Sequence, residues 1–180
     1  NDVIRPGAGD DTINGGGGID TVDVAADATL VFNTTLGLWQ TISATEGTDA
    51  LSSVGVVQVN PTFLLVGGGG DFASIQAALD FAADPLNGID AANTTVLVAP
   101  GVTDAGFVVA ASLAGITIAG PNAGIAGTGV RGTEAVVTGS STIAAASVTI
   151  DGLRFQIDGA ATVGLTDEAV LIQGIGAVVE

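Results

Sequence analysis

Several side-chain types with distinctive chemistry are absent from this 180-residue sequence. There is no cysteine, so neither a disulfide framework nor a thiolate metal site can form, and nothing indicates a redox compartment. Histidine, lysine and tyrosine are also absent, which removes three of the four usual general bases of a polysaccharide lyase. Only 4% of the residues are aromatic and 28 are glycine, so the core must be built from small aliphatic residues in short strands joined by many turns.

Positive charge is scarce as well. Three arginines, Arg5, Arg131 and Arg154, face 19 acidic residues, and the formal net charge is −16. This balance should repel nucleic acids and anionic membrane surfaces, so we expect no nucleic-acid partner. No run of about 18 apolar residues would span a bilayer, so we expect no membrane insertion, and no signal peptide is recognisable. Bound cations would reduce the self-repulsion of such a chain.

The first 23 residues contain a repeat. An aspartate recurs every nine residues, and an aliphatic residue follows each aspartate two positions later. The six positions are Asp2, Ile4, Asp11, Ile13, Asp20 and Val22. Glycine-rich runs separate them, so each unit predicts a turn with positive φ followed by a very short strand whose aliphatic residue points inward. One unit cannot bury that residue alone, so neighbouring units must stack.

The repeat also predicts a chemistry. Aspartate carboxylates and the carbonyl oxygens of glycine turns are hard oxygen ligands, which suit Ca²⁺ as the cofactor. We therefore expect calcium ligands at Asp2, Gly7, Gly9, Asp11, Gly16, Gly18 and Asp20. The alternative interpretation is a flexible Gly/Asp loop without a ligand. The shared register of three units favours calcium-binding repeats.

This stretch resembles the RTX (repeats-in-toxin) calcium β-roll, with the pattern G-G-x-G-x-D-x-U-x. It departs from the pattern at Pro6 and Ala8, and only about two and a half units are present. Residues 46–54 resemble the segment that often follows such repeats and caps the roll. The resemblance implies type I secretion and an extracellular or bacterial cell-surface location. We expect residues 1–23 to form the β-roll and residues 24–66 a β-rich capping or linking segment.

One amphipathic helix is predicted, over residues 74–84. Ser74 is a suitable N-cap, Pro85 would stop the helix, and the apolar positions recur with a period of 3.6 residues. These positions are Ile75, Ala78, Leu79 and Ala82. The four glycines at residues 67–70 lack the residues of a phosphate-binding loop, so we interpret them as a hinge or tight turn at a domain boundary.

Short apolar strands separated by Gly, Asn and Pro turns fill the rest of the chain. Four segments are similar to the start of pectin-lyase-like right-handed β-helices: residues 71–82 (DFASIQAALDFA), 95–101 (TVLVAPG), 115–122 (GITIAGPN) and 148–155 (VTIDGLRF). We therefore expect an all-β fold in which a short calcium β-roll leads into a right-handed parallel β-helix, a solenoid with one N-terminal capping helix. The β-helix would occupy residues 67–180.

No catalytic site is predicted. The best local set, Asp151, Arg154, Gln156 and Asp158, places Asp151 and Arg154 at opposite parity on a strand, so a turn aspartate and a surface arginine are the simpler interpretation. Trp39 could stack on a sugar, but core packing is favoured. Asp49 could add a cation ligand, but capping a turn is favoured.

The main hypothesis is a secreted, calcium-binding surface or matrix protein fragment with a structural, adhesive or self-assembling function. Its partners would be other copies of the chain, end to end or laterally, or an extracellular polysaccharide. Asn1 falls inside a repeat and the last strands look like an uncapped coil, so we expect either a piece of a longer protein or a subunit whose ends stack. The alternative is the N-terminal part of a secreted carbohydrate-active β-helix enzyme, such as a pectinesterase, lyase or epimerase, whose catalytic coils lie elsewhere.

Overall fold

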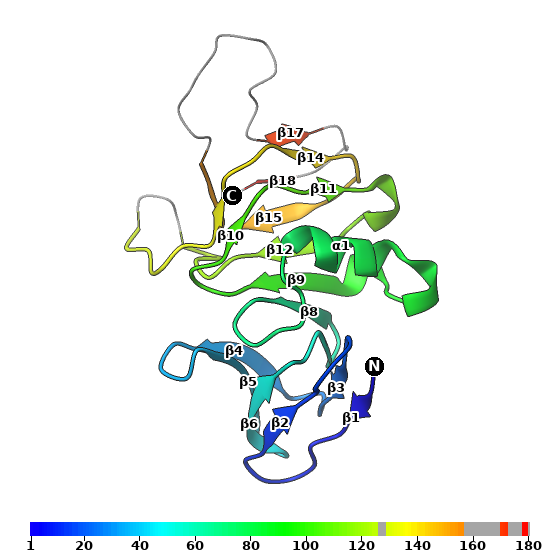
Figure 1. Cartoon of the computed structure of the whole chain (residues 1–180), viewed down its shortest axis with the longest axis vertical. Helices are drawn as coiled ribbons and strands as arrows, with labels where there is room; N and C mark the ends of the chain where they lie inside the picture. The colour runs from blue at the N-terminus through cyan, green and yellow to red at the C-terminus, as the bar shows by residue number, and fades with distance from the viewer. Residues whose placement is uncertain (126–128, 157–169, 173–177, 180) are drawn as a thin grey trace. The chain divides into compact units, whose positions relative to one another are not determined.

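The computed structural model describes residues 1–125, 129–156, 170–172 and 178–179. Most of their regular structure is β-strand, and α1 (Ile75–Ala83) is the only α-helix among them (Figure 1). The expected all-β character with one helix is therefore confirmed. The chain divides into two compact units, Asn1–Ala73 and Ser74–Glu180, so the glycines at residues 67–70 lie inside the first unit.

One sheet of the first unit contains β1 (Val3–Ile4), β3 (Thr21–Asp23), β7 (Val56–Gln58) and β8 (Thr62–Val66) in that order. β1, β3 and β7 are parallel, and β8 returns antiparallel to β7. Val3 pairs with Thr21, two repeat lengths later. The chain therefore returns to the same sheet after every second repeat.

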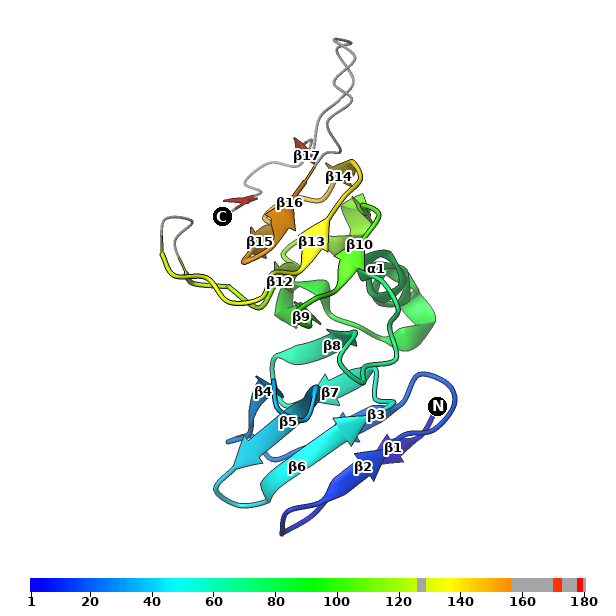
Figure 2. The same cartoon turned by 60° about the vertical axis from the view of Figure 1, so that its left-hand side comes forward.

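The intervening repeat contributes to another sheet. This sheet has the order β2 (Thr12–Asn14), β6 (Gly47–Ser52), β5 (Leu38–Ser43) and β4 (Thr29–Asn33). β2 and β6 are parallel, whereas β4, β5 and β6 are antiparallel neighbours, and all four lie side by side in Figure 2. The hairpin of β4 and β5 is thus inserted before the chain resumes the parallel pairing of the repeats.

The aliphatic residues of the repeats contribute to the core as expected. Ile13 is 6% exposed and Val22 is fully buried, while Ile4 is half-buried.

Trp39 is only 5% exposed, packs edge-on against Phe32 and donates its indole N–H to the Gly67 carbonyl oxygen at 2.9 Å. The idea of Trp39 as an exposed sugar-stacking platform is therefore wrong, because burial leaves no free ring face.

In the second unit, all described strand pairs are parallel. From β9 onward, each of three sheets contains every third strand, because each pass of the chain contributes one short strand to each sheet. Their members are β9 (Thr94–Val98), β12 (Thr117–Ala119), β15 (Thr149–Asp151) and β18 (Val178–Val179); β10 (Thr103–Asp104), β13 (Val136–Val137) and β16 (Arg154–Phe155); and β11 (Val108–Val109), β14 (Ser141–Ile143) and β17 (Val170–Ile172). Short 3₁₀ helices occur at Pro85–Asn87, Ala91–Asn93 and Ala111–Leu113.

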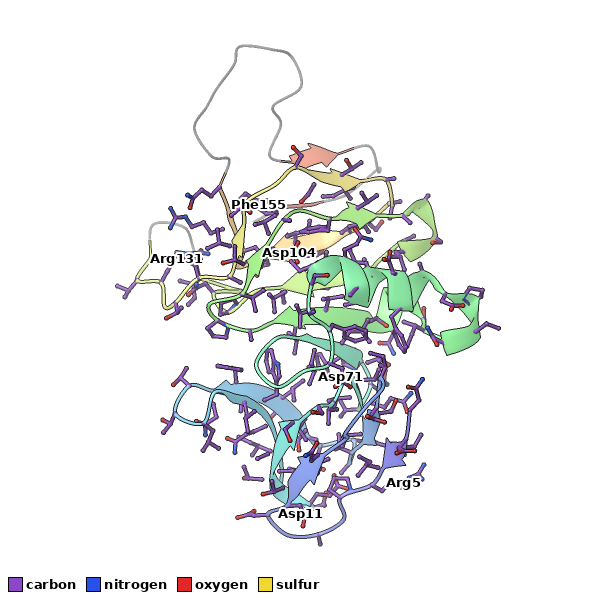
Figure 3. All side chains as sticks on the ribbon, viewed as in Figure 1. Arg5, Asp11, Asp71, Asp104, Arg131 and Phe155 are labelled. Carbon is purple, nitrogen blue, oxygen red and sulfur yellow. The ribbon has the colours of Figure 1, made fainter. Side chains whose placement is uncertain are left out.

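The helix α1 matches its prediction closely. The Ser74 hydroxyl accepts the backbone N–H of Ala77, and the four apolar positions predicted for the inner face are the four buried ones. The Ile75 N–H donates to Oδ2 of Asp104, a 4% exposed residue of β10 that is labelled in Figure 3. This contact anchors the start of the helix to a strand of the same unit.

Candidate metal centre

The two complete glycine turns of the repeats have the same backbone conformation. Gly7 and Gly16, nine positions apart, have φ values of 84° and 87°, and Gly9 and Gly18 have values of 126° and 117°. Side chains rarely adopt such angles, so glycine is required at all four positions by the backbone itself. The nine-residue period is therefore a period of conformation as well as of sequence.

The predicted ligands separate into two stacks of turns. The Asp20 stack consists of Asn1 and Asp2, residues 15–20, residues 52–55, and Gly70 with Asp71. Its layers are joined by hydrogen bonds from Ile19 N–H to Asn1 Oδ1 (2.9 Å) and from Gly15 N–H to the Ser52 carbonyl (3.1 Å). Of the predicted ligands, this stack contains Asp2, Gly16, Gly18 and Asp20.

The remaining predicted ligands, Gly7, Gly9 and Asp11, lie in the Asp11 stack, which consists of residues 7–11 and 46–49. Its two layers are joined by the hydrogen bond from Gly9 N–H to the Glu46 carbonyl (2.7 Å). The seven residues therefore do not converge on one point. They are divided between two stacks, each of which takes members from a later segment of the chain.

Asp20 is the central residue of its stack. It is fully buried, and its Oδ1 accepts the backbone N–H of Asp2 at 2.6 Å and lies 3.4 Å from the amino nitrogen of Asn1. Its Oδ2 is buried and has no hydrogen-bond partner. Among the described residues, it is the only buried side-chain nitrogen or oxygen atom without one. A buried carboxylate oxygen without a partner is costly, so it points to a missing positive group or proton.

Asp71 lies on the other side of Asp20 in the stack. Its Oδ2 accepts the Asp20 N–H at 3.1 Å. Burial raises the pKa of Asp71 above its ordinary value, and the charge of Asp20 raises it further, against the hydrogen bond from the Asp20 amide, which lowers it. We did not predict Asp71 as a site residue. The signal was present, because four glycines precede Asp71 much as four glycines precede Ile19 and Asp20.

In the Asp11 stack, the carboxylates of Asp49 and Asp10 accept hydrogen bonds from protein groups. Asp49 is 1% exposed, and it accepts the Asp11 N–H at Oδ1 (3.0 Å) and the Thr41 hydroxyl at Oδ2 (3.1 Å). Oδ1 of Asp10 accepts the Thr48 N–H at 2.8 Å. Asp49 lies in strand β6, and its carboxylate holds the backbone of Asp11 in the neighbouring layer. This role is closer to the predicted cap of a turn than to a cation ligand. Figure 3 labels Asp11 and Asp71, one from each stack.

The fit of a calcium ion can be judged from these donors. Within the described residues, no three acidic or other ligating side chains form a group that would hold a metal by themselves. Calcium accepts backbone carbonyl oxygens in place of carboxylates, and it needs six to eight oxygens in total. The Asp20 stack offers the right type of ligand, because an unpartnered buried carboxylate oxygen lies beside glycine turns. The Asp11 stack lacks such an oxygen.

The local polar set in the second unit does not form a catalytic constellation. Oδ2 of Asp151 accepts the Gly124 N–H at 2.7 Å, so this carboxylate caps a turn, as favoured from the sequence. The Arg154 side chain is exposed, and Asp158 lies outside the described residues. Arg131 pairs instead with Glu134 at 2.8 Å.

In the part of the chain that the structure describes, no helix combines the length and the apolar character needed to cross a bilayer. Comparison of the chain with protein-family models, with curated proteins and with solved structures found no match.

Proposed function

We propose that this chain is part of a secreted, calcium-binding scaffold protein of the cell surface or extracellular matrix. In this proposal, calcium orders the repeats at residues 1–23, and the strands of the second unit form a parallel β-helix that serves as the scaffold. The function is structural or adhesive, and the partners are other copies of the chain or an extracellular polysaccharide.

One observation carries the calcium part of the proposal. The Asp20 side chain is fully buried between turns of repeated conformation, and its Oδ2 has no partner among the protein groups. A bound divalent cation supplies positive charge to that oxygen and cross-links the layers it touches. Asp20 and backbone carbonyl oxygens of the adjacent glycine turns would hold it. A net charge of −16 makes cation binding favourable at long range as well.

The strand pairing supports the scaffold part. In the second unit, Thr95, Thr117 and Thr149 occupy equivalent positions in three adjacent parallel strands. The inner residues Val96, Ile118 and Ile150 are all fully buried and follow the same register. Stacked layers of similar facing residues are typical of solenoids, which serve widely as extended binding surfaces.

The direct test combines calorimetric titration with thermal unfolding. The protein is titrated with CaCl₂ after removal of metals with EDTA, and its melting temperature is compared in EDTA, in millimolar Ca²⁺ and in millimolar Mg²⁺. A ligand at 100 times its Kd stabilises the folded state by about 2.7 kcal/mol, so the expected result is a higher melting temperature in Ca²⁺ and a smaller rise in Mg²⁺. An unchanged melting temperature in millimolar Ca²⁺, with no heat of binding, would reject the proposal.

A further inference from the structure

Three aspartates form a ladder in the Asp20 stack. The Asp2 N–H donates to the Asp20 carboxylate, and the Asp20 N–H donates to the Asp71 carboxylate, at 2.6 and 3.1 Å. Each carboxylate therefore caps the backbone of the layer before it. Asp2 and Asp20 belong to the nine-residue repeats, whereas Asp71 comes 51 residues after Asp20, outside their period. Nothing in the repeat pattern assigns Asp71 a role.

The segment that carries Asp71 is held in the stack by its backbone. Gly67, Gly68 and Gly69 have φ values of 68°, 59° and 83°, and the Gly70 N–H closes the turn on the Gly67 carbonyl at 2.9 Å. Gly70 forms a parallel bridge with Val54. These glycines form a tight turn that places Asp71 against Asp20, in agreement with one of the two predicted alternatives.

A second oxygen borders the same small space beside Gly15 as the unpartnered Oδ2 of Asp20. Ser53 has a φ of 49°, unusual for a residue with a side chain, and its carbonyl oxygen points at Gly15. A Cβ added to Gly15 would lie 2.8 Å from Oδ2 of Asp20 and would collide with the Ser53 carbonyl oxygen. Glycine at position 15 therefore lets two oxygens from different segments approach the same place.

We infer that Asp20, Asp71 and the Ser53 carbonyl oxygen form a site for one divalent cation, of the hard type that Ca²⁺ represents. This inference rests on the proposed calcium binding and extends it to residues outside the repeats. All the donors are oxygens, which excludes a preference for soft metals. The Asp71 carboxylate lies against the peptide nitrogen of Asp20, so a cation between the two carboxylates relieves their mutual repulsion and satisfies Oδ2 of Asp20.

The site has a consequence for the architecture. The cation joins the last glycine turn of the repeats to the 67–71 turn, so it fixes the end of the first unit as well as its repeats.

The test compares the wild-type chain with Asp71→Asn and with Asp80→Asn. The Asp71→Asn substitution keeps a carbonyl oxygen for the Asp20 N–H but removes the charge, and Asp80→Asn removes the same charge from an exposed position of α1. Calorimetric titration with CaCl₂ gives the number and affinity of the sites. We expect Asp71→Asn to lose one site or to bind it at least tenfold more weakly, and Asp80→Asn to bind as the wild type does.

The outcomes separate this inference from the proposed function. If the wild type binds Ca²⁺ and Asp71→Asn binds it with unchanged number and affinity, the Asp71 site is rejected and the proposed function stands. If the wild type does not bind Ca²⁺, both are rejected. If Asp71→Asn does not fold, ¹³C NMR of the wild type decides: the Asp71 Cγ resonance should shift on addition of Ca²⁺, and an unchanged resonance would reject the site.

Discussion

The backbone N–H of Asp2 donates to Oδ1 of Asp20 at 2.6 Å, across a separation of 18 residues. The two residues precede β1 and β3, which are parallel neighbours in one sheet. A carboxylate of one layer thus holds the amide of the layer before it. The two oxygens of Asp20 therefore differ: Oδ1 accepts this hydrogen bond between layers, and Oδ2, which has no partner, is the atom proposed to bind a cation.

Substitutions of Asp20 should separate these roles. Asp20→Ala removes the acceptor of the Asp2 amide, so we expect it to lower the free energy of unfolding in EDTA by about 1–3 kcal/mol. Asp20→Asn keeps a carbonyl acceptor but loses the charge. We expect it to lower the free energy of unfolding in EDTA by less than Asp20→Ala does, and to abolish the stabilisation by Ca²⁺. Urea unfolding followed by the fluorescence of Trp39, which lies in the same unit, measures both. A Ca²⁺ effect retained in Asp20→Asn would contradict the assignment.

The glycine turn offers a pair of neighbouring substitutions that isolate backbone strain. Gly16 has a φ of 87° and Gly17 has no positive φ, and a Cβ added at either would meet nothing within 4 Å. We expect Gly16→Ala to destabilise the apoprotein by about 1–2 kcal/mol, because alanine is strained in the left-handed region. Gly17→Ala should stay within about 0.5 kcal/mol of the wild type. Equal stabilities of the two variants would show that the turn does not hold this conformation in solution.

The sequence predicted those features of the first unit that depend on local pattern. The period shared by Asp2, Asp11 and Asp20 placed three short strands and two glycine turns, and all of them are present. Pairing over long distances was not predictable in the same way. The partner of β2 is β6, although β3, β4 and β5 lie between them in the sequence, and no short-range period encodes such a pairing.

The missed site residue has a similar explanation. Asp71 follows a glycine run, but the aliphatic residue that should come two positions after a repeat aspartate is absent, since Ala73 stands there. The run therefore does not continue the nine-residue pattern. Only the hydrogen bond from the Asp20 amide shows that Asp71 takes the place of the next repeat aspartate.

In the second unit, the start of α1 depends on one buried carboxylate and one exposed cap. Asp104 accepts the Ile75 N–H through Oδ2 and the Gly106 N–H through Oδ1, whereas Ser74 accepts only the Ala77 N–H. We expect Ser74→Ala to cost about 1 kcal/mol. Asp104→Ala should cost more, about 2–5 kcal/mol, because it leaves the buried Ile75 N–H and the partly buried Gly106 N–H without an acceptor. Calorimetric unfolding ranks the two variants, and the reverse order would contradict this anchoring role.

The ion pair of Arg131 with Glu134 predicts a pH dependence of stability. Arg131 Nε and Nη2 donate to Oε1 and Oε2 of Glu134 at 2.8 and 3.3 Å, and these hydrogen bonds lower the pKa of Glu134 from its ordinary 4.5. The unfolded chain then binds this proton more readily than the folded chain, so the contribution to stability is present above the unfolded pKa. It is lost as the pH falls through the lower folded pKa.

Glu134→Gln keeps the shape of the side chain and removes its charge. We expect the wild type to melt at a higher temperature than Glu134→Gln at pH 7, and the difference to vanish as the pH falls below 4.5. In an Arg131→Gln background, the melting temperatures with Glu134 and with Gln at position 134 should differ little, both at pH 7 and below pH 4.5, because the positive partner is gone. A difference that persists in that background, or that grows toward low pH, would exclude Arg131 as the cause of the lowered pKa.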